Sequence, residues 1–310
     1  MLSRVAESLY WLSRNVERAE TLARLLEVNV NRTIDRRASA RDAAERIWRG
    51  VLHIAGSTSG PWLEDDPHLS AVEHCAFSTE DGTSILSCVR VARANALSVR
   101  AELSSEVWEA INGLYLFVDA QSPRSVARSG ISSFLHSVRD NAQAIGGIVD
   151  ATLTRDDEWS FLVLGRYLER ASMTTRILIS HDEADDSAPE WQRILEMCCA
   201  SEPFAKEQRY SSDPSEVLAF LVLHQRFPRS TRFCVHAVND ALHRLSETPA
   251  QSYSNEAERL LGRMQALLDF VTVNEIVDEG ITAFAGRLGE RFDAVGAAIH
   301  AAYFPRIPVL

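Results

Sequence analysis

Apolar side chains recur along the opening segment with the period of an α-helix. They are spaced alternately by four and three residues and comprise Val5, Leu9, Leu12, Val16, Ala19, Ala23, Leu26 and Val30. This spacing places them along one side of a helix. A second apolar strip lies away from the first and consists of Tyr10, Trp11, Leu22, Leu25 and Val28. Because a helix that is apolar on two sides has two faces to cover, we expect it to be buried on both.

Helical periodicity continues along most of the remaining chain, and no alternation typical of a strand is convincing. Clusters of Gly, Pro and polar residues mark the breaks, and Ser122-Pro and Ser212-Asp-Pro resemble helix starts with a cap and an early proline. The sequence predicts an all-α fold. Its further predicted helices cover residues 41–55, 67–76, 83–118, 124–152, 157–180, 188–200, 213–247, 253–279 and 281–303.

The opening helix is echoed later in the chain, where Trp11–Leu26 returns, altered, as Val163–Leu178. Three more matches follow in the same order: Trp48–Leu52 with Trp191–Leu195, Arg90–Arg93 with Arg226–Arg229, and Ile131–Phe134 with Ile281–Phe284. Each match is weak alone, but their common order indicates an internal duplication. We therefore predict two helical repeats, residues 1–153 and 154–310, packed as one compact body about a pseudo-two-fold axis.

The first of these internal matches includes a cluster of charged residues. Arg14, Glu17, Thr21 and Arg24 line up beside the second apolar strip, and Arg18 lies one step round the helix. The later copy repeats Arg14, Glu17 and Arg18 as Arg166, Glu169 and Arg170. Charges on a buried helix need partners, so we expect the two glutamates to be buried and bonded to arginine. If the copies are neighbours, four arginines face two glutamates. The surplus positive charge predicts an arginine-rich anion-binding site between the repeats.

Two other interpretations of these six residues remain open. The Glu-Arg pairs can be purely structural, because buried ion pairs often fix the register of packed helices. Alternatively, one of the motif glutamates can act as a general acid or base, which would require a cleft and a raised pKa. The sequence assigns no catalytic residue by itself.

Composition narrows the class of protein. A net charge of −11 argues against general nucleic-acid binding, and 46% hydrophobic residues suffice for a large core. Lys206 is the single lysine, so arginine supplies nearly all positive charge; a GC-rich genome explains this most simply, although arginine also suits carboxylate and phosphate recognition. Five cysteines without a CxxC pair fit a reduced, cytoplasmic protein, and we expect no signal peptide or membrane span.

Other chemical signatures are weak. Asp65-x-x-His68 and Asp240-x-x-His243 have a spacing seen in metal-binding bundles, but they do not correspond under the duplication and no Glu-x-x-His accompanies them. There is no P-loop, no GxGxxG and no local nucleophile signature. We therefore predict neither a metal nor a cofactor.

The segment from Met1 to Glu20, together with Glu158–Ala171, closely resembles the bacterial alpha-E domain proteins, an all-helical family named for a Glu-Arg motif. The resemblance covers essentially the whole chain and implies that Glu17-Arg18 and Glu169-Arg170 are the motif pairs. The family's Ala-Arg-Glu-Asn-Ala-Arg segment reads Ala92-Arg-Ala-Asn-Ala-Leu97 here, so it lacks the Glu and the final Arg.

Members of this family are usually encoded beside, or fused to, a circularly permuted ATP-grasp ligase and a transglutaminase-like peptidase. The resemblance thus implies a non-redox accessory protein of a peptide- or amide-ligase system, whose partners are the ligase, the transglutaminase-like protein and an anionic small molecule or peptide. An enzyme that uses a motif glutamate, and a structural scaffold, are the alternatives.

Overall fold

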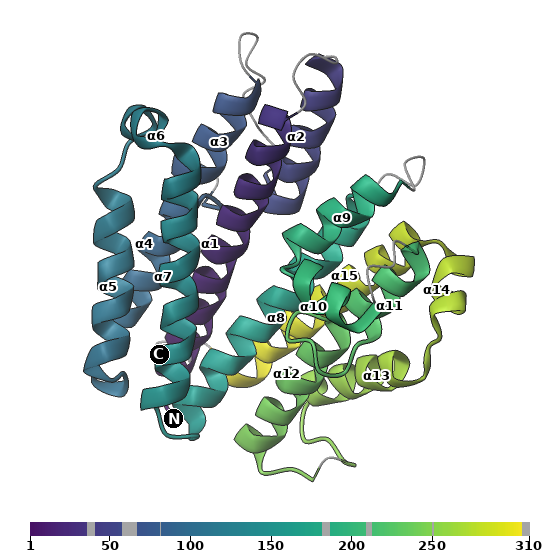
Figure 1. Cartoon of the computed structure of the whole chain (residues 1–310). Coiled ribbons are helices and arrows are strands. Elements are labelled where there is room, and N and C mark those ends of the chain that lie inside the picture. The colour runs from purple at the N-terminus through teal and green to yellow at the C-terminus, as the bar shows by residue number, and fades with distance from the viewer. Residues whose placement is uncertain are drawn as a thin grey trace. The chain divides into compact units, whose positions relative to one another are not determined.

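The computed structural model describes residues 1–35, 41–57, 67–80, 82–181, 187–208, 213–249 and 251–305. Helices account for most of these residues, and no strand occurs among them (Figure 1). The predicted all-α fold is confirmed. Within the same residues, no helix combines the length and the apolar character needed to cross a bilayer.

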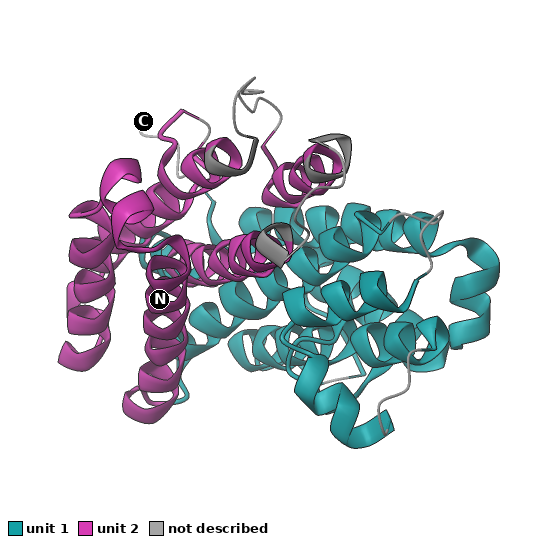
Figure 2. Ribbon diagram, turned by 45° about the horizontal axis from the view of Figure 1, so that its top comes forward, with its two compact units in different colours: residues 1–10, 155–310 teal, residues 11–154 magenta. Residues whose placement is uncertain are grey.

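The chain divides into two compact units, which are described separately below (Figure 2). Unit 1 contains residues 1–10 and 155–310, and unit 2 contains residues 11–154. Helix α1 (Ser3–Asp35) therefore contributes its first turns to unit 1 and the remainder to unit 2. The two-repeat division at residues 153 and 154, and the duplication behind it, stay predictions.

Unit 2 consists of the main part of α1 and of shorter helices that follow one another around it. In α4 and α5 the buried positions recur every three or four residues, and α5 packs against both α4 and α7. The core includes Leu22, Trp48, Ile85 and Ile111. The helices after α1 are α2 (Arg41–Ala55), α3 (Pro67–Phe77), α4 (Ile85–Ser98), the short 3₁₀ turn η1 (Arg100–Glu102), α5 (Ser105–Asp119), α6 (Pro123–Ser129) and α7 (Ile131–Thr152).

Unit 1 is organised around α8 (Asp157–Ile179), which is buried along much of its length and packs against α12 and α15 (Figure 1). The α13 helix contacts both α12 and α15. The remaining helices of this unit are α9 (Ala188–Met197), α10 (Ser201–Gln208), α11 (Pro214–Leu223), α12 (Thr231–Ser246), α13 (Glu256–Phe270), α14 (Val273–Glu279) and α15 (Ile281–Tyr303).

Side-chain caps explain where several helices begin. Ser84, Ser104, Ser122 and Ser230 each accept a hydrogen bond from the backbone N–H three residues further on, which satisfies one of the donors that a helix start leaves unpaired. The helix start predicted at Ser122-Pro is confirmed. The one predicted near Ser212 begins at Pro214 with Asp213 as its cap, while Ser212 lies outside the described residues.

Four predicted helices are each divided in two. Residues 83–118 form α4 and α5, because Ser104 caps a new helix after the turn at η1. Residues 124–152 break at Gly130, residues 213–247 break at the loop 224–230, and residues 253–279 break before Val273. Apart from Pro228 in the loop 224–230, these breaks contain no proline, and the periodic pattern runs across them.

The last three helices of the two units have similar dimensions. In unit 2, α5, α6 and α7 span 15, 7 and 22 residues, and in unit 1 α13, α14 and α15 span 15, 7 and 23 residues. A glycine with positive φ joins the second helix to the third in each case: Gly130 at 109° and Gly280 at 93°.

Candidate functional site

The first motif cluster lies on α1 in unit 2. Glu17 is buried, with 6% of its surface exposed, whereas Arg14 and Arg18 are half-buried. The guanidinium carbon of Arg14 lies 5.1 Å from the centre of the Trp11 ring, within reach of a cation–π contact.

The second motif cluster lies on α8 in unit 1. Glu169 is 1% exposed and Arg166 is also buried, while Arg170 is half-buried. Arg170 Nη1 donates to the carbonyl of Pro228 at 3.2 Å, and one turn later Thr174 Oγ1 donates to the carbonyl of Arg229 at 3.1 Å. These two bonds hold the loop 224–230 against the motif helix.

The expected burial of both motif glutamates is confirmed. The clusters belong to different units, so the expectation that Arg14, Glu17 and Arg18 meet Arg166, Glu169 and Arg170 stays a prediction.

A buried ion pair that we did not single out lies one turn beyond the first cluster. Glu20 accepts from Arg24 Nη2 on α1 and from Gln143 Nε2 on α7, the latter at 3.0 Å, and both charged residues are buried. The i,i+4 spacing of Glu20 and Arg24 was the available sequence signal. This pair shows that α1 of unit 2 carries charge in its core and that the charge is paired.

A pocket of about 510 Å³ adjoins the second motif cluster, and we call it the Arg170 pocket. Three cationic side chains line it: Arg170 from α8, and Arg226 and Arg229 from the loop 224–230. Glu169 is not among its lining residues. The other lining residues are Cys199, Pro203, Glu207, Phe220, His224, Phe227 and Pro228.

The charge balance of the Arg170 pocket is positive. Among the described residues that line it, Glu207 is the one carboxylate, and His224 Nε2 donates to Glu207 Oε2 at 2.8 Å. The other ring nitrogen, His224 Nδ1, accepts from the backbone N–H of Phe227 at 2.8 Å, so the histidine is held in one orientation. Phe220 and Phe227 supply an apolar wall, with ring centres 4.8 Å apart.

The sequence signals for this pocket were partial. The internal matches singled out Arg170, Arg226 and Arg229 but placed them in no common cavity. Phe220 and Phe227 carried no signal, because aromatic residues at helical spacing are ordinary core positions.

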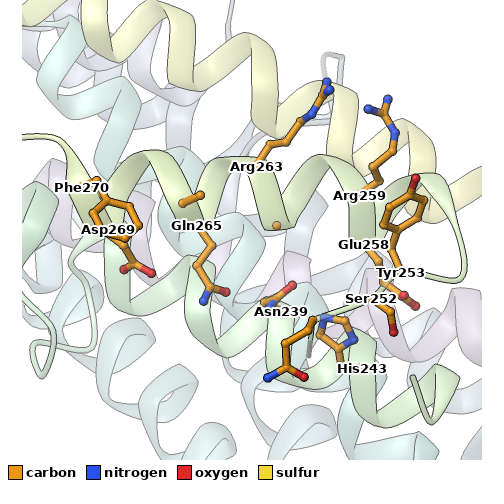
Figure 3. Close-up of a pocket in the computed structure, with 13 residues that line it drawn as sticks. Asn239, His243, Ser252, Tyr253, Glu258, Arg259, Arg263, Gln265, Asp269 and Phe270 are labelled. Carbon is orange, nitrogen blue, oxygen red and sulfur yellow. The ribbon is translucent and has the colours of Figure 1, made fainter. Parts of the chain in front are cut away.

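A second pocket of about 510 Å³ opens between α12 and α13 in the same unit (Figure 3). We call it the Asn239 pocket. Its polar residues include the buried Asn239, His243 of α12 and Gln265 of α13. Asn239 Oδ1 and Gln265 Oε1 are buried without a hydrogen-bond partner in the described part of the chain.

Two carboxylates line the Asn239 pocket, and both have a lowered pKa. Burial alone would raise the pKa of Glu258, but hydrogen bonds from the Ser254 backbone and from the Ser246 and Ser254 hydroxyls outweigh it. Burial would likewise raise the pKa of Asp269, but His236 and Arg232 lower it, each through a 2.8 Å bond to Oδ1. Both groups are therefore ionised at neutral pH.

The described residues contain no group of three or more His, Cys, Asp or Glu side chains arranged to hold a metal ion. Asp240 is exposed, and His243 Nδ1 donates instead to the carbonyl of Thr248 at 3.1 Å. Asp65 lies outside the described residues, as does the side chain of His68. All five cysteines are free, and Cys199 is the exposed one.

Comparison with known proteins identifies the family. Residues 1–304 match the model of Alpha-E, described as a predicted alpha-helical domain with a conserved ER motif. The chain belongs to the Alpha-E family. The sequence contains five Glu-Arg pairs: Glu17-Arg18, Glu45-Arg46, Glu169-Arg170, Glu258-Arg259 and Glu290-Arg291. The side chains of Glu258 and Arg259 line the Asn239 pocket, so the family description alone does not select the motif pair.

This Alpha-E chain is similar to uncharacterized proteins of Mycobacterium bovis and Mycobacterium tuberculosis. Each is 22% identical over 96% of the chain. The chain spans only 35% of the length of these relatives, which therefore carry a long additional region. No solved structure matches the chain.

Proposed function

We propose that this Alpha-E protein is a non-redox binding protein that holds an anionic ligand in the Arg170 pocket. The observation that carries the proposal is the meeting of Arg170, Arg226 and Arg229 around one cavity, where the described lining residues include one carboxylate. Arginine presents planar forks of N–H donors that match carboxylate and phosphate oxygens. A motif arginine thus has a chemical use beyond pairing with glutamate.

The pocket also limits the kind of anion. Its volume falls in the usual range of small-molecule sites, and its wall of Phe220 and Phe227 suits an apolar or planar part of a ligand. An acidic amino acid, a short acidic peptide or a phosphorylated intermediate has the required combination of charge and size.

We further propose that the partners are an ATP-grasp ligase and a transglutaminase-like protein, as the family resemblance implies. The additional length of the mycobacterial relatives is consistent with an Alpha-E region that works beside other domains. A phosphorylated intermediate of such a ligase would carry the charges that an arginine-lined pocket suits. Affinity purification from the native host should recover these partners, and recovery of neither would contradict this part of the proposal.

The two units are proposed to derive from one duplicated repeat. In support, α5–α6–α7 and α13–α14–α15 have nearly equal lengths and equivalent glycines. In addition, the capping hydroxyls of Ser84 and Ser230 each donate to the carbonyl six residues earlier, at Ser78 and His224. The cap and its unusual second bond are thus present at both helix starts.

The ligand proposal is tested by titrating phosphate, glutamate, acidic peptides and nucleotides against the intact protein while following its melting temperature. A bound anion should raise the melting temperature saturably. Arg226→Met, at an exposed pocket residue, should weaken the response roughly tenfold or more, because a hydrogen bond to a charged group is lost. Arg128→Met, which removes an exposed arginine of unit 2, serves as the charge-matched control. If no anion shifts the native protein, or if both variants weaken the response equally, the pocket is not the site.

A structural role for charge in α1 is a second candidate. The buried Glu20–Arg24 pair favours it, because a paired charge in a helix core can fix packing without any ligand. This role concerns unit 2 and is compatible with an anion site in unit 1.

A further inference from the structure

The Asn239 pocket has a counterpart position in unit 2 that is filled by an arginine. Arg93 is the ninth residue of α4, and Asn239 is the ninth residue of α12. On the partner helices the buried positions have the same spacing: Val107, Ile111, Leu114 and Val118 on α5, and Ala257, Leu261, Met264 and Leu268 on α13. This register, which rests on the proposed duplication, aligns Trp108, Asn112, Tyr115 and Asp119 with Glu258, Gly262, Gln265 and Asp269. It replaces the match of Arg90–Arg93 with Arg226–Arg229, because Arg90 and Arg93 lie within α4 whereas Arg226 and Arg229 lie in the loop before α12.

At one end of the paired helices, α4 with α5 in unit 2 and α12 with α13 in unit 1, the side-chain contacts are similar. In unit 2, Arg90 Nη2 donates to Asp119 Oδ1 at 2.7 Å. In unit 1, His236 Nε2 donates to Asp269 Oδ1 at 2.8 Å, and these two residues occupy the aligned positions. A side-chain N–H donor on the first helix therefore bonds to an aspartate on the second in each case.

One turn further along, the units differ. In unit 2 the half-buried Arg93 has partners on α5: its Nε donates to Asn112 Oδ1 at 2.9 Å, and its guanidinium carbon lies 4.5 Å from the Tyr115 ring centre and 5.9 Å from that of Trp108. In unit 1 the aligned residues are Asn239, Gly262, Gln265 and Glu258. Each is smaller than its counterpart, and the space becomes the Asn239 pocket.

Two hydrogen-bond acceptors of the pocket have no donor in the described part of the chain. Asn239 is only 6% exposed, and its Oδ1, like Gln265 Oε1, lacks a hydrogen-bond partner in the described chain. A buried acceptor left unmade costs free energy, so a ligand that supplies N–H groups would relieve that cost. The ionised Glu258, which accepts hydrogen bonds from the neutral donors of Ser254 and Asn255, favours a positive charge on that ligand, whereas the charge of Asp269 is already offset by Arg232.

The arginines of this pocket lie on a neighbouring strip of α13. Glu258, Gly262, Gln265 and Asp269 follow one helical face, whereas Arg259 and Arg263 each follow one of those residues in sequence, about 100° around the helix. Figure 3 shows Arg259 and Arg263 rising from α13 on the side away from Asn239 and His243. Arg259 is, moreover, paired with Glu256 through its Nε at 2.6 Å.

We propose that the Asn239 pocket binds a guanidinium group supplied from outside the unit, either as free arginine or as an arginine side chain of a peptide. The carboxamides of Asn239 and Gln265 accept its N–H groups, in the place where unit 2 holds the guanidinium of Arg93. This site is distinct from the Arg170 pocket and takes a ligand group of opposite charge.

The test is a calorimetric and thermal-shift titration of the intact protein with L-arginine and with an arginine-containing peptide, using L-lysine and L-citrulline as probes that lack the fork or the charge. Arginine should bind saturably and more tightly than either control. A response to the peptide but not to the free amino acid would identify the peptide as the source of the group. A response to neither overturns the proposal.

Two variants decide whether the binding is in this pocket. Asn239→Arg should place a guanidinium on α12 as Arg93 does on α4, so arginine should no longer bind and the melting temperature should not fall. Should that variant fail to fold, Asn239→Leu removes the amide without adding charge and should abolish the response. Persistent binding in Asn239→Leu would overturn the site.

Arg263→Ala separates this proposal from an anion site in the same pocket. Removing Arg263 should leave arginine binding unchanged or stronger, because a like charge is lost. If instead the pocket responds to phosphate and loses that response in Arg263→Ala, it is an anion site and the guanidinium proposal fails. Arg226→Met should leave arginine binding intact, so failure here and failure of the Arg170 pocket are distinguishable.

Discussion

Glu-Arg pairs with the same i,i+4 spacing are buried on α1 but exposed on α2. Glu20 and Arg24 are both buried, whereas Glu45 and Arg49 of α2 form an i,i+4 pair with 34% and 60% of their side chains exposed. The same spacing therefore occurs in a buried and in an exposed ion pair, and these are expected to contribute differently to the free energy of unfolding. The difference lies in the second apolar strip of the opening helix.

Glu20→Ala should lower the free energy of unfolding by about 3–5 kcal/mol, because it leaves Arg24 buried without this carboxylate. Glu45→Ala removes an equally spaced but exposed partner and should cost about 0–1 kcal/mol. Denaturant unfolding of both variants gives the comparison. Equal losses would show that burial of the α1 pair has no energetic consequence.

Glu258 provides a residue-scale prediction with a pH dependence. Its side chain is 2% exposed and accepts from Ser254 N at 2.7 Å, Ser254 Oγ at 2.8 Å and Asn255 Nδ2 at 2.8 Å. The pKa is lowered below the ordinary value of 4.5, so the carboxylate contributes stability above that pH. This stability is lost as the pH falls through the still lower folded-state pKa.

Glu258→Gln should therefore reduce stability at neutral pH by about 1.5–3 kcal/mol, the usual worth of hydrogen bonds to a charged group. The difference in stability between the variant and the native protein should narrow as the pH falls from about 4.5 towards the lower folded-state pKa, because the unfolded chain takes up the proton first. Melting curves across this pH range measure the gap. A gap that stays constant or widens in acid would contradict the assigned ionisation.

At the residue scale, the sequence pointed to the charged motif residues but not to the side-chain amides of the Asn239 pocket. The repetition of Arg14, Glu17 and Arg18 as Arg166, Glu169 and Arg170 drew attention to the motif, and both glutamates are buried as expected. Asn239 and Gln265 gave no signal, because a carboxamide on a helix is ordinary. What makes them notable is the missing partner, which only packing reveals.

At the scale of elements, the hydrophobic periodicity predicted where the helices lie but not where all of them end. The period of apolar residues continues from α6 into α7, since Val126, Phe134 and Val138 are all buried. What separates the two helices is the backbone at Gly130, whose positive φ redirects the chain. A single glycine in a helical pattern is an ambiguous signal, so the sequence merged the two helices.

Gly130→Ala and Gly280→Ala should each destabilise the protein by about 1–3 kcal/mol, because φ values of 109° and 93° are strained for any residue with a Cβ. Space is not the cause, since a Cβ on Gly130 would meet nothing closer than Ser133 Cβ at 4.0 Å. Chemical denaturation of each variant measures the loss.

Gly147→Ala is the matched control for this pair, because Gly147 lies in the interior of α7 with no atom near its would-be Cβ. That substitution should stabilise the protein by about 0.5–1 kcal/mol through helix propensity. If Gly130→Ala behaved like Gly147→Ala, the turn between α6 and α7 would not need its positive φ.

At the scale of the whole molecule, the first ten residues belong to a unit that otherwise starts at Arg155. Hydrophobic periodicity predicted the helix that contains them but carries no information about which later helix they contact. The contacts are specific. The ring of Tyr10 lies 5.4 Å from that of Phe304, and Glu7 Oε1 lies 3.6 Å from His300 Nε2.

Tyr10→Ala should lower the free energy of unfolding by about 3–5 kcal/mol, since it deletes an aromatic ring that is 2% exposed. The effect should be local to unit 1: amide hydrogen exchange should accelerate first in α8 and α15, because these helices pack together there.

Phe134→Ala is the matched deletion in unit 2, where that ring lies 5.4 Å from Phe77 and 5.9 Å from Phe117. It should accelerate exchange first in α3, α5 and α7. If both variants accelerated exchange equally in both sets of helices, residues 1–10 would not stabilise unit 1 selectively, and the chain would open as a single cooperative body.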